Sequence, residues 1–341
     1  MKLFKGVQPQ VMLSTAAVVL ISALAIVLML GVFSDDSATD DDTAQLDNRA
    51  VARELGASNR LLDSGLAIDY TTEPSIALTD VLSGGPGKDG IPALTDPLFE
   101  QLSDSSVSDD TQVMVVTHNG ETKIYPYSIL VWHEIVNDTV GGKPVAVTFC
   151  PLCGSAIVFD REIDGEVVDF GVSGFLYQSN LLMYDRSDSE SLWSQSIGEA
   201  VVGQKTGERL EYFPLELMTF AEAKIAYPNA TALSENTGFN RDYTGNPYAG
   251  YEDTEETIFP VSVEDKRFPA KEVFYIVPLE GMSIAVRQDK EDGVYSVPDS
   301  DITVTFDKGQ ITANWGEAEL PGYYEMWFSW ATHNQETGII L

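Results

Sequence analysis

The pattern of hydrophobic and polar positions divides the chain into two parts. Val11 to Phe33 carries no charged side chain, and this run exceeds the roughly 20 residues with which a helix crosses a bilayer. From Ile68 onward, short runs rich in Val, Ile, Tyr and Phe alternate with Gly, Pro, Asn and Asp, which is typical of strands and turns. We therefore expect one transmembrane helix followed by a mainly β domain.

The charges that flank the apolar run predict its orientation. Lys2 and Lys5 precede it, and Asp35 and Asp36 follow it. The positive-inside rule then keeps residues 1–10 in the cytoplasm and places the rest of the chain outside. The run is longer than the apolar core of about 7 to 15 residues in a cleaved signal peptide. We expect residues 11–33 to remain as a single-pass membrane anchor.

Two further segments follow the anchor. Residues 34–65 begin with the acidic stretch Ser34 to Asp47, whose low apolar content predicts a solvated tether. Asn48 to Gly65 has apolar positions at helical spacing and predicts a short helix. For residues 66–341 we expect a single extracytoplasmic domain of the α+β class. It should be predominantly β, with mixed or antiparallel sheets or a barrel-like arrangement and a few short helices.

Local signals place several elements inside this domain. The runs Val113–Thr117 and Thr122–Tyr125 flank an Asn-Gly pair, which favours the tight turn of a β-hairpin. Apolar residues recur at helical spacing in Tyr127–Asp138 and in the aromatic segment Tyr323–His333, so each predicts a helix. Strands are predicted over Pro144–Cys150 and Ala156–Phe159.

Charge and loop composition exclude some classes of function. The chain has 53 acidic and 20 basic residues, a formal charge of -33, and such a field repels the phosphates of nucleic acids. An acidic surface of this kind suits a high-salt medium, as in halophiles, or a domain that faces an anionic cell surface. Ser83–Gly90 resembles a phosphate loop but lacks its Gly-Lys-Ser/Thr ending. We expect neither nucleic-acid binding nor a nucleotide cofactor, and the sequence identifies no protein partner.

Cys150 and Cys153 are the two cysteines of the chain, and they form a C-x-x-C motif. A structural disulfide across so short a loop would remove little chain entropy. A thioredoxin-like motif needs a helix that begins at the first cysteine, whereas the residues after Cys153 indicate a turn that enters a strand. A third interpretation is a metal knuckle, in which two thiolates from one turn bind one ion. All three interpretations remain open.

A metal site would need further ligands. Two thiolates with imidazole or thioether select copper(I), or zinc in a tetrahedral site. His133 is the first choice, since it lies just before the cysteine strand, and its alternative is a buried histidine that hydrogen-bonds to backbone or carboxylate. Additional candidates are His333, Met183 and Asp185.

A series of motifs resembles one known family. The motifs are Ser83–Pro92, Trp132–Asp138, Thr148–Ser155, Phe170–Gly174, Leu181–Arg186 and Ser191–Gln195. Together they resemble domain of unknown function 3179, a family of exported proteins that contain Cys-Pro-Leu-Cys-Gly, from about residue 81 to the end of the chain. Gln178–Asn180 departs from the Asn-Ser-Asp of the family, so no catalytic role is assigned there. The resemblance implies one site that contains His133, Cys150 and Cys153.

Three functions follow from these observations. The protein binds a soft metal, copper rather than zinc, at Cys150, Cys153 and His133; or it is a thiol–disulfide oxidoreductase that uses the same cysteines; or it is a cell-surface interaction module whose cysteines are structural. Whether it is an enzyme is left open. Asn137 and Asn229 begin sequons for N-glycosylation.

Overall fold

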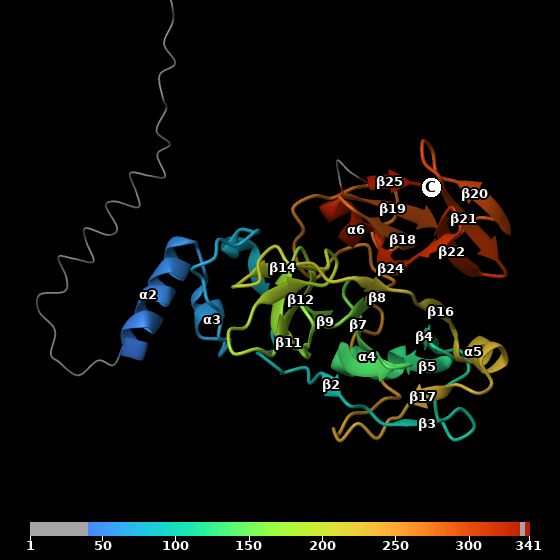
Figure 1. The fold of residues 1–341 in the computed structure, drawn as a ribbon, viewed down its shortest axis with the longest axis horizontal. Coiled ribbons are helices and arrows are strands. Elements are labelled where there is room, and N and C mark those ends of the chain that lie inside the picture. Colours follow the sequence, from blue (N-terminus) through green and yellow to red (C-terminus); the bar gives the residue numbers. More distant parts are fainter. Residues whose placement is uncertain (1–39, 335–337) are drawn as a thin grey trace, which may run out of the picture. The chain divides into compact units, whose positions relative to one another are not determined.

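Strands dominate the computed structural model of the protein, which describes residues 40–334 and 338–341 (Figure 1). The expected anchor at residues 11–33 lies outside these residues. Within them, no helix is both long and apolar enough to cross a membrane. Residues 48–341 form one compact unit.

Helical structure begins earlier than the expected tether allows. Helix α2 (Asp40–Glu54) starts inside the segment Ser34 to Asp47, so the tether prediction is wrong from Asp40 onward. Ala52 in this helix is fully buried, and a helix that is fixed by packing extends easily over neighbouring helix-forming residues. Helix α3 (Asn59–Leu62) follows, with Ser58 as its N-cap. The single short helix predicted over Asn48 to Gly65 is therefore two helical pieces.

The large sheet carries the cysteines. Its strand order is β2-β6-β7-β8-β24-β18-β19-β25, and β15 also pairs with β8. The strands are β2 (Leu94–Thr95), β6 (Ile135–Val140), β7 (Lys143–Cys150), β8 (Ser155–Asp160), β15 (Tyr212–Phe213), β18 (Val273–Leu279), β19 (Met282–Arg287), β24 (Tyr323–Met326) and β25 (Gly338–Ile340). Strands β7 and β8 confirm the two strands predicted around the cysteines. Strand β24 comes from the far end of the chain and inserts between β8 and β18.

A second sheet, called here the β12 sheet, has the order β1-β11-β12-β13-β14. Its strands are β1 (Val81–Ser83), β11 (Phe170–Tyr177), β12 (Asn180–Asp185), β13 (Leu192–Ser194) and β14 (Glu199–Val202). Gln178 and Ser179 form the turn between β11 and β12, with φ values of 52° and 64°. Two positive φ values are typical of the tight hairpin turn that usually contains Asn-Gly. This turn is therefore strained.

A third sheet contains the hairpin that the Asn-Gly pair predicted. Strands β4 (Gln112–His118) and β5 (Glu121–Pro126) pair across Asn119 and Gly120, which both have positive φ. The sheet order is β16-β4-β5-β17-β3, with β3 (Phe99–Gln101), β16 (Glu216–Thr219) and β17 (Thr231–Leu233). Helix α5 (Phe220–Ala226) follows β16 and begins with a capping box formed by Thr219 and Glu222. The hairpin prediction is confirmed.

The remaining strands form small sheets. Strands β20 (Gly293–Ser296), β21 (Ile302–Asp307), β22 (Gln310–Trp315) and β23 (Ala318–Leu320) form a meander, and β9 (Glu162–Ile163) pairs with β10 (Glu166–Val167). A 3₁₀ turn over Leu78–Asp80 precedes β1. The described residues thus form a predominantly β fold with a few short helices, and their sheets close no barrel.

Two predicted helices are shorter than expected. Helix α4 (Tyr127–His133) ends at Glu134, whose φ of 58° stops it, and the second half of the predicted helix is strand β6. Helix α6 (Trp327–His333) follows β24, so the first part of Tyr323–His333 is also a strand. In both cases the residues pair with a strand from elsewhere in the sequence. Such pairing overrides a local helical pattern.

The two sequons differ in exposure. Asn137 is fully buried in β6, where its amide both donates to the carbonyl of Phe170 and accepts from its N–H, each at 2.8 Å. Asn229 lies on the surface before β17. Only Asn229 is therefore accessible to a glycosyltransferase in the folded protein.

Candidate functional site

The tight turn between β7 and β8 brings Cys150 and Cys153 together. The N–H of Cys153 donates to the carbonyl of Cys150 at 3.2 Å, and Gly154 has a φ of 56°. A Cβ at Gly154 would lie 2.9 Å from Cγ of Met326, so this position needs glycine. The two Sγ atoms are 2.7 Å apart. A strand and not a helix follows Cys153, as the sequence indicated.

The strained turn of the β12 sheet contacts the second cysteine. The Cys153 thiol donates to the Ser179 carbonyl at 3.3 Å and accepts from Nδ2 of Asn180 at 3.2 Å. Cys153 has no exposed surface and Cys150 is only 2% exposed. Burial raises the pKa of the Cys153 thiol well above its usual value, and Cys150 and the Glu325 carboxylate raise it further. Cys153 is thus a neutral thiol at physiological pH.

A buried amide network supports the cysteine turn. Gln195 accepts from Ser155 Oγ at 2.6 Å and donates to Thr148 Oγ1 at 2.9 Å. Asn180 Nδ2 also approaches Ser155 Oγ and Oε1 of Gln195. All these side chains are fully buried. Because buried polar groups are costly to leave unpaired, this network holds β7, β8 and β12 in one arrangement around the sulfurs.

A buried carboxyl group lies next to a residue that contacts the cysteine turn. Glu325 in β24 has no exposed surface, and its Oε1 accepts from Ser196 Oγ and Ser329 Oγ, each at 2.6 Å. The next residue, Met326, donates its N–H to the carbonyl of Cys153 at 2.9 Å. Burial raises the pKa of Glu325 to about 7. This acid can therefore gain or lose a proton near neutral pH.

Aromatic residues of a long loop lie at or near the cysteine turn. Residues 234–272, between β17 and β18, form neither helix nor strand, and long loops of this kind often have a functional role. Within this loop, the Tyr251 hydroxyl donates to the carbonyl of Leu152 at 2.9 Å. Tyr248 approaches the buried acid Glu134 at 3.5 Å, and burial raises the pKa of Glu134 to about 8. A cavity of about 510 Å³ opens beside Tyr248 and Tyr251.

His133, the first candidate for a further metal ligand, contacts other groups. Its Nδ1 lies 2.7 Å from the carbonyl of Pro92, and its Nε2 lies 2.8 Å from the Tyr243 hydroxyl. Burial lowers its pKa. To bind a metal together with the cysteines, His133 would have to give up one of these hydrogen bonds.

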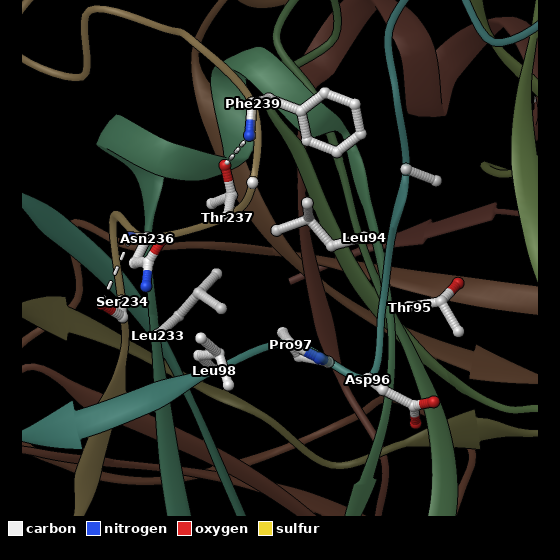
Figure 2. Close-up of a pocket in the computed structure, with 12 residues that line it drawn as sticks. Leu94, Thr95, Asp96, Pro97, Leu98, Leu233, Ser234, Asn236, Thr237 and Phe239 are labelled. Carbon is white, nitrogen blue, oxygen red and sulfur yellow. Dashed lines mark hydrogen bonds between the residues drawn. The ribbon is translucent and has the colours of Figure 1, made fainter.

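Tyr243 connects His133 to a separate cavity. Its hydroxyl is 2.5 Å from Oγ1 of Thr237, and Thr237 lines a cavity of about 420 Å³ between residues 93–98 and 233–239. Figure 2 shows Leu94, Leu233 and Phe239 around this space, with Thr237 and Asn236 as polar groups beside it. The Phe239 ring also lies 5.5 Å from the His133 ring. His133 thus lies behind the wall of this cavity.

The other candidate ligands lie in different surroundings. Met183 is fully buried in β12 and pairs with Trp193 across the sheet. Asp185 accepts from the Trp193 indole at 2.7 Å. His333 lies in α6 beside the ring of Tyr177, at 5.6 Å, and burial lowers its pKa to about 4. Within residues 40–334 and 338–341, no three His, Cys, Asp or Glu side chains are grouped so that they could hold a metal ion.

The residues nearest the sulfurs were missed by sequence reasoning. Asn180 departs from the family pattern and carries no role that the sequence assigns, yet it donates to the Cys153 sulfur. Gln195 closes one of the quoted family motifs, which was the signal available for it. Glu325 is one of many acidic residues in the chain, and no local feature distinguishes it from solvated ones.

The comparisons with known proteins identify the family. Comparison of the chain with curated proteins and with solved structures gives no match. Residues 88–320, which contain both cysteines, Asn180 and Gln195, match the family described as "Protein of unknown function (DUF3179)". The match covers more than half of the 341 residues, and the chain therefore belongs to the DUF3179 family.

Proposed function

We propose that Cys150 and Cys153 form a redox pair that alternates between dithiol and disulfide. The observation that carries this proposal is the 2.7 Å distance between the two Sγ atoms. A disulfide bond is about 2.05 Å long, so the two sulfurs need only a small further approach to form one. The amide network around Thr148, Ser155 and Gln195 keeps the turn fixed, so bond formation needs little movement. Because burial raises the pKa of the Cys153 thiol and only a thiolate attacks a disulfide, we assign the first reaction with a small disulfide to Cys150.

The pair should exchange electrons with small thiols. We expect full-length protein in detergent to convert reversibly between two free thiols and none when equilibrated with mixtures of a small dithiol and its disulfide. In Cys153→Ser, the remaining Cys150 thiol can form only a mixed disulfide with the probe, so one probe molecule per protein should be retained. Thiol counting and mass spectrometry measure both results. A folded wild-type protein whose thiols never oxidise, or whose disulfide never reduces, would contradict the proposal.

A soft metal is the second candidate, and the same turn favours it. Two sulfurs presented by one tight turn between strands resemble half of a zinc knuckle, and two thiolates suit copper(I). A metal that binds only the native state stabilises it by about 2.7 kcal/mol at a hundredfold excess over Kd. Melting the protein with and without copper(I) or zinc separates the candidates. Metal binding predicts that the metal raises the melting temperature of wild type. This increase should be absent in Cys150→Ser, smaller in His133→Ala, and unchanged in His118→Ala, whose side chain lies at the end of β4.

We further infer that the first segment anchors this domain to the outer face of a membrane. The uncharged run at residues 11–33 and the charges on either side of it support this location. Amino-terminal sequencing of protein extracted from membranes should find the chain intact through residue 33. Protease added to intact cells should remove the region beyond Asp35. A mature chain that begins near Ser34, or full protection from protease, would contradict the anchor or its orientation respectively.

A further inference from the structure

Hydrogen bonds connect Cys153 to a buried acid on another part of the chain. Asn180 donates to the Cys153 sulfur at 3.2 Å and accepts from the N–H of Ser196 at 3.1 Å. The Ser196 hydroxyl in turn donates to Glu325 at 2.6 Å. Glu325 is also held next to the cysteine turn by its neighbour, since Met326 bonds to the carbonyl of Cys153. Asn180 and Ser196 therefore link the carboxyl group of Glu325 to the Cys153 thiol, and within the described residues no direct hydrogen bond joins the two groups.

The second oxygen of this carboxyl group is free. Within the described residues, Oε2 of Glu325 is buried and has no hydrogen-bond partner, and the same holds for Oγ of Ser179 on the turn that contacts Cys153. Buried polar atoms in folded proteins are nearly always paired, so an exception needs an explanation. A carboxylate oxygen that must be able to take up a proton provides one.

We propose that Glu325 accepts the proton that Cys153 releases when it closes the disulfide, and returns it to the leaving thiolate. This inference rests on the proposed redox function. A small disulfide, RSSR, first reacts with Cys150, which gives Cys150–S–S–R and one RSH. The Cys153 proton then moves to Glu325, the Cys153 thiolate attacks Sγ of Cys150, and the bond between Cys150 and the SR group breaks. The leaving RS⁻ takes the proton from Glu325, so the products are the internal disulfide and two RSH.

The burial of Cys153 makes such an acceptor necessary. Its pKa is raised well above the usual value of a thiol, and only the thiolate attacks a disulfide. The other titratable groups that face Glu325 are Tyr212 of β15 and Tyr323 of β24. Burial raises the pKa of both tyrosines, so they stay neutral and cannot take the proton. The pKa of about 7 fits Glu325 to this role.

The test follows the second step of the reaction by itself. Full-length reduced protein is mixed with bis(2-hydroxyethyl) disulfide, and the loss of the mixed disulfide is followed by mass spectrometry from pH 5.5 to 9. For wild type we expect the rate of this step to rise with an apparent pKa near 7. Glu325→Gln should lose that rise and be roughly 100-fold slower at pH 8, the usual scale of a lost general base. The first step, measured in Cys153→Ser with and without Glu325→Gln, should not change.

The controls separate this role from charge and from folding. Glu208 also has a buried carboxylate oxygen without a partner in the described structure, so Glu208→Gln is the matched variant and should behave as wild type. Glu325→Asp should recover part of the rate and the pH dependence. A faster second step in Glu325→Gln, as expected when a negative charge is removed from beside a thiol, would overturn the proposal. Rapid disulfide closure that is independent of Glu325 overturns this inference alone, whereas no closure in wild type overturns the redox function with it.

Discussion

Replacing Trp193 by alanine is expected to lower the free energy of unfolding by about 3 to 5 kcal/mol. Trp193 is fully buried in β13, and its ring packs edge-on against Phe170 at 5.7 Å. Its indole N–H donates to Asp185 at 2.7 Å, and Asp185 is itself fully buried. The substitution therefore creates a cavity and also removes a partner from a buried carboxylate.

Trp315 provides the matched control for this substitution. It lies in β22 and is 59% exposed, so Trp315→Ala should change stability by no more than about 0.5 kcal/mol. Denaturant unfolding followed by circular dichroism measures both variants without relying on tryptophan fluorescence. Equal effects of the two substitutions would show that the packing around Trp193 does not determine stability.

The protein should also lose stability as the pH rises from about 4.5 to 8. Burial raises the pKa of Glu134 to about 8 and that of Glu325 to about 7, from 4.5 in the unfolded chain. The folded state therefore binds more protons than the unfolded state in this range, so the stability contribution is fully present below pH 4.5 and is lost as the pH passes the folded pKa. At about 1.4 kcal/mol per pKa unit, the loss of unfolding free energy is at most about 5 kcal/mol for Glu134 and about 3 kcal/mol for Glu325.

Glutamine variants isolate these two groups from the many other acids of the chain. Glu134→Gln and Glu325→Gln should each flatten the curve of unfolding free energy against pH. Repulsion within a chain of formal charge -33 also weakens at low pH, but it is screened by salt. At high salt, the difference between wild type and each variant should therefore persist. Curves that remain parallel between pH 5 and 8 would contradict the assignment.

The parts of the fold that the sequence predicted well depend on neighbouring residues. The hairpin of β4 and β5 follows from Asn119 and Gly120, because two residues determine that turn. The cysteine turn followed for the same reason. The helix expected over Tyr127–Asp138 failed at Glu134, because β6 is determined by its pairing with β7. An apolar pattern of that length suits either element, and only the partner strand decides between them.

Of the residues in the candidate site, only the two cysteines could be predicted from the sequence. Asn180 and Gln195 follow the cysteines by tens of residues, and Glu325 follows Cys150 by more than half of the chain. Their role depends on burial and on sheet order, which no local pattern records. His133 is a candidate ligand because it lies close to Cys150 in the sequence. Its ring nitrogens instead bond to Pro92 and Tyr243, residues that the fold brings together from either side of the cysteine motif.

The position of β24 between β8 and β18 has a consequence for biosynthesis. This strand belongs to the middle of the large sheet but is made near the end of translation. Until Tyr323–Met326 has emerged, the first part of β8 lacks its partner at Ala156, and Glu325 and the backbone contact from Met326 to Cys153 are missing. Cys150 and Cys153 are thus made long before their enclosure can be completed. Before then, proteins that are too large to reach Cys150 in the finished fold have access to both cysteines.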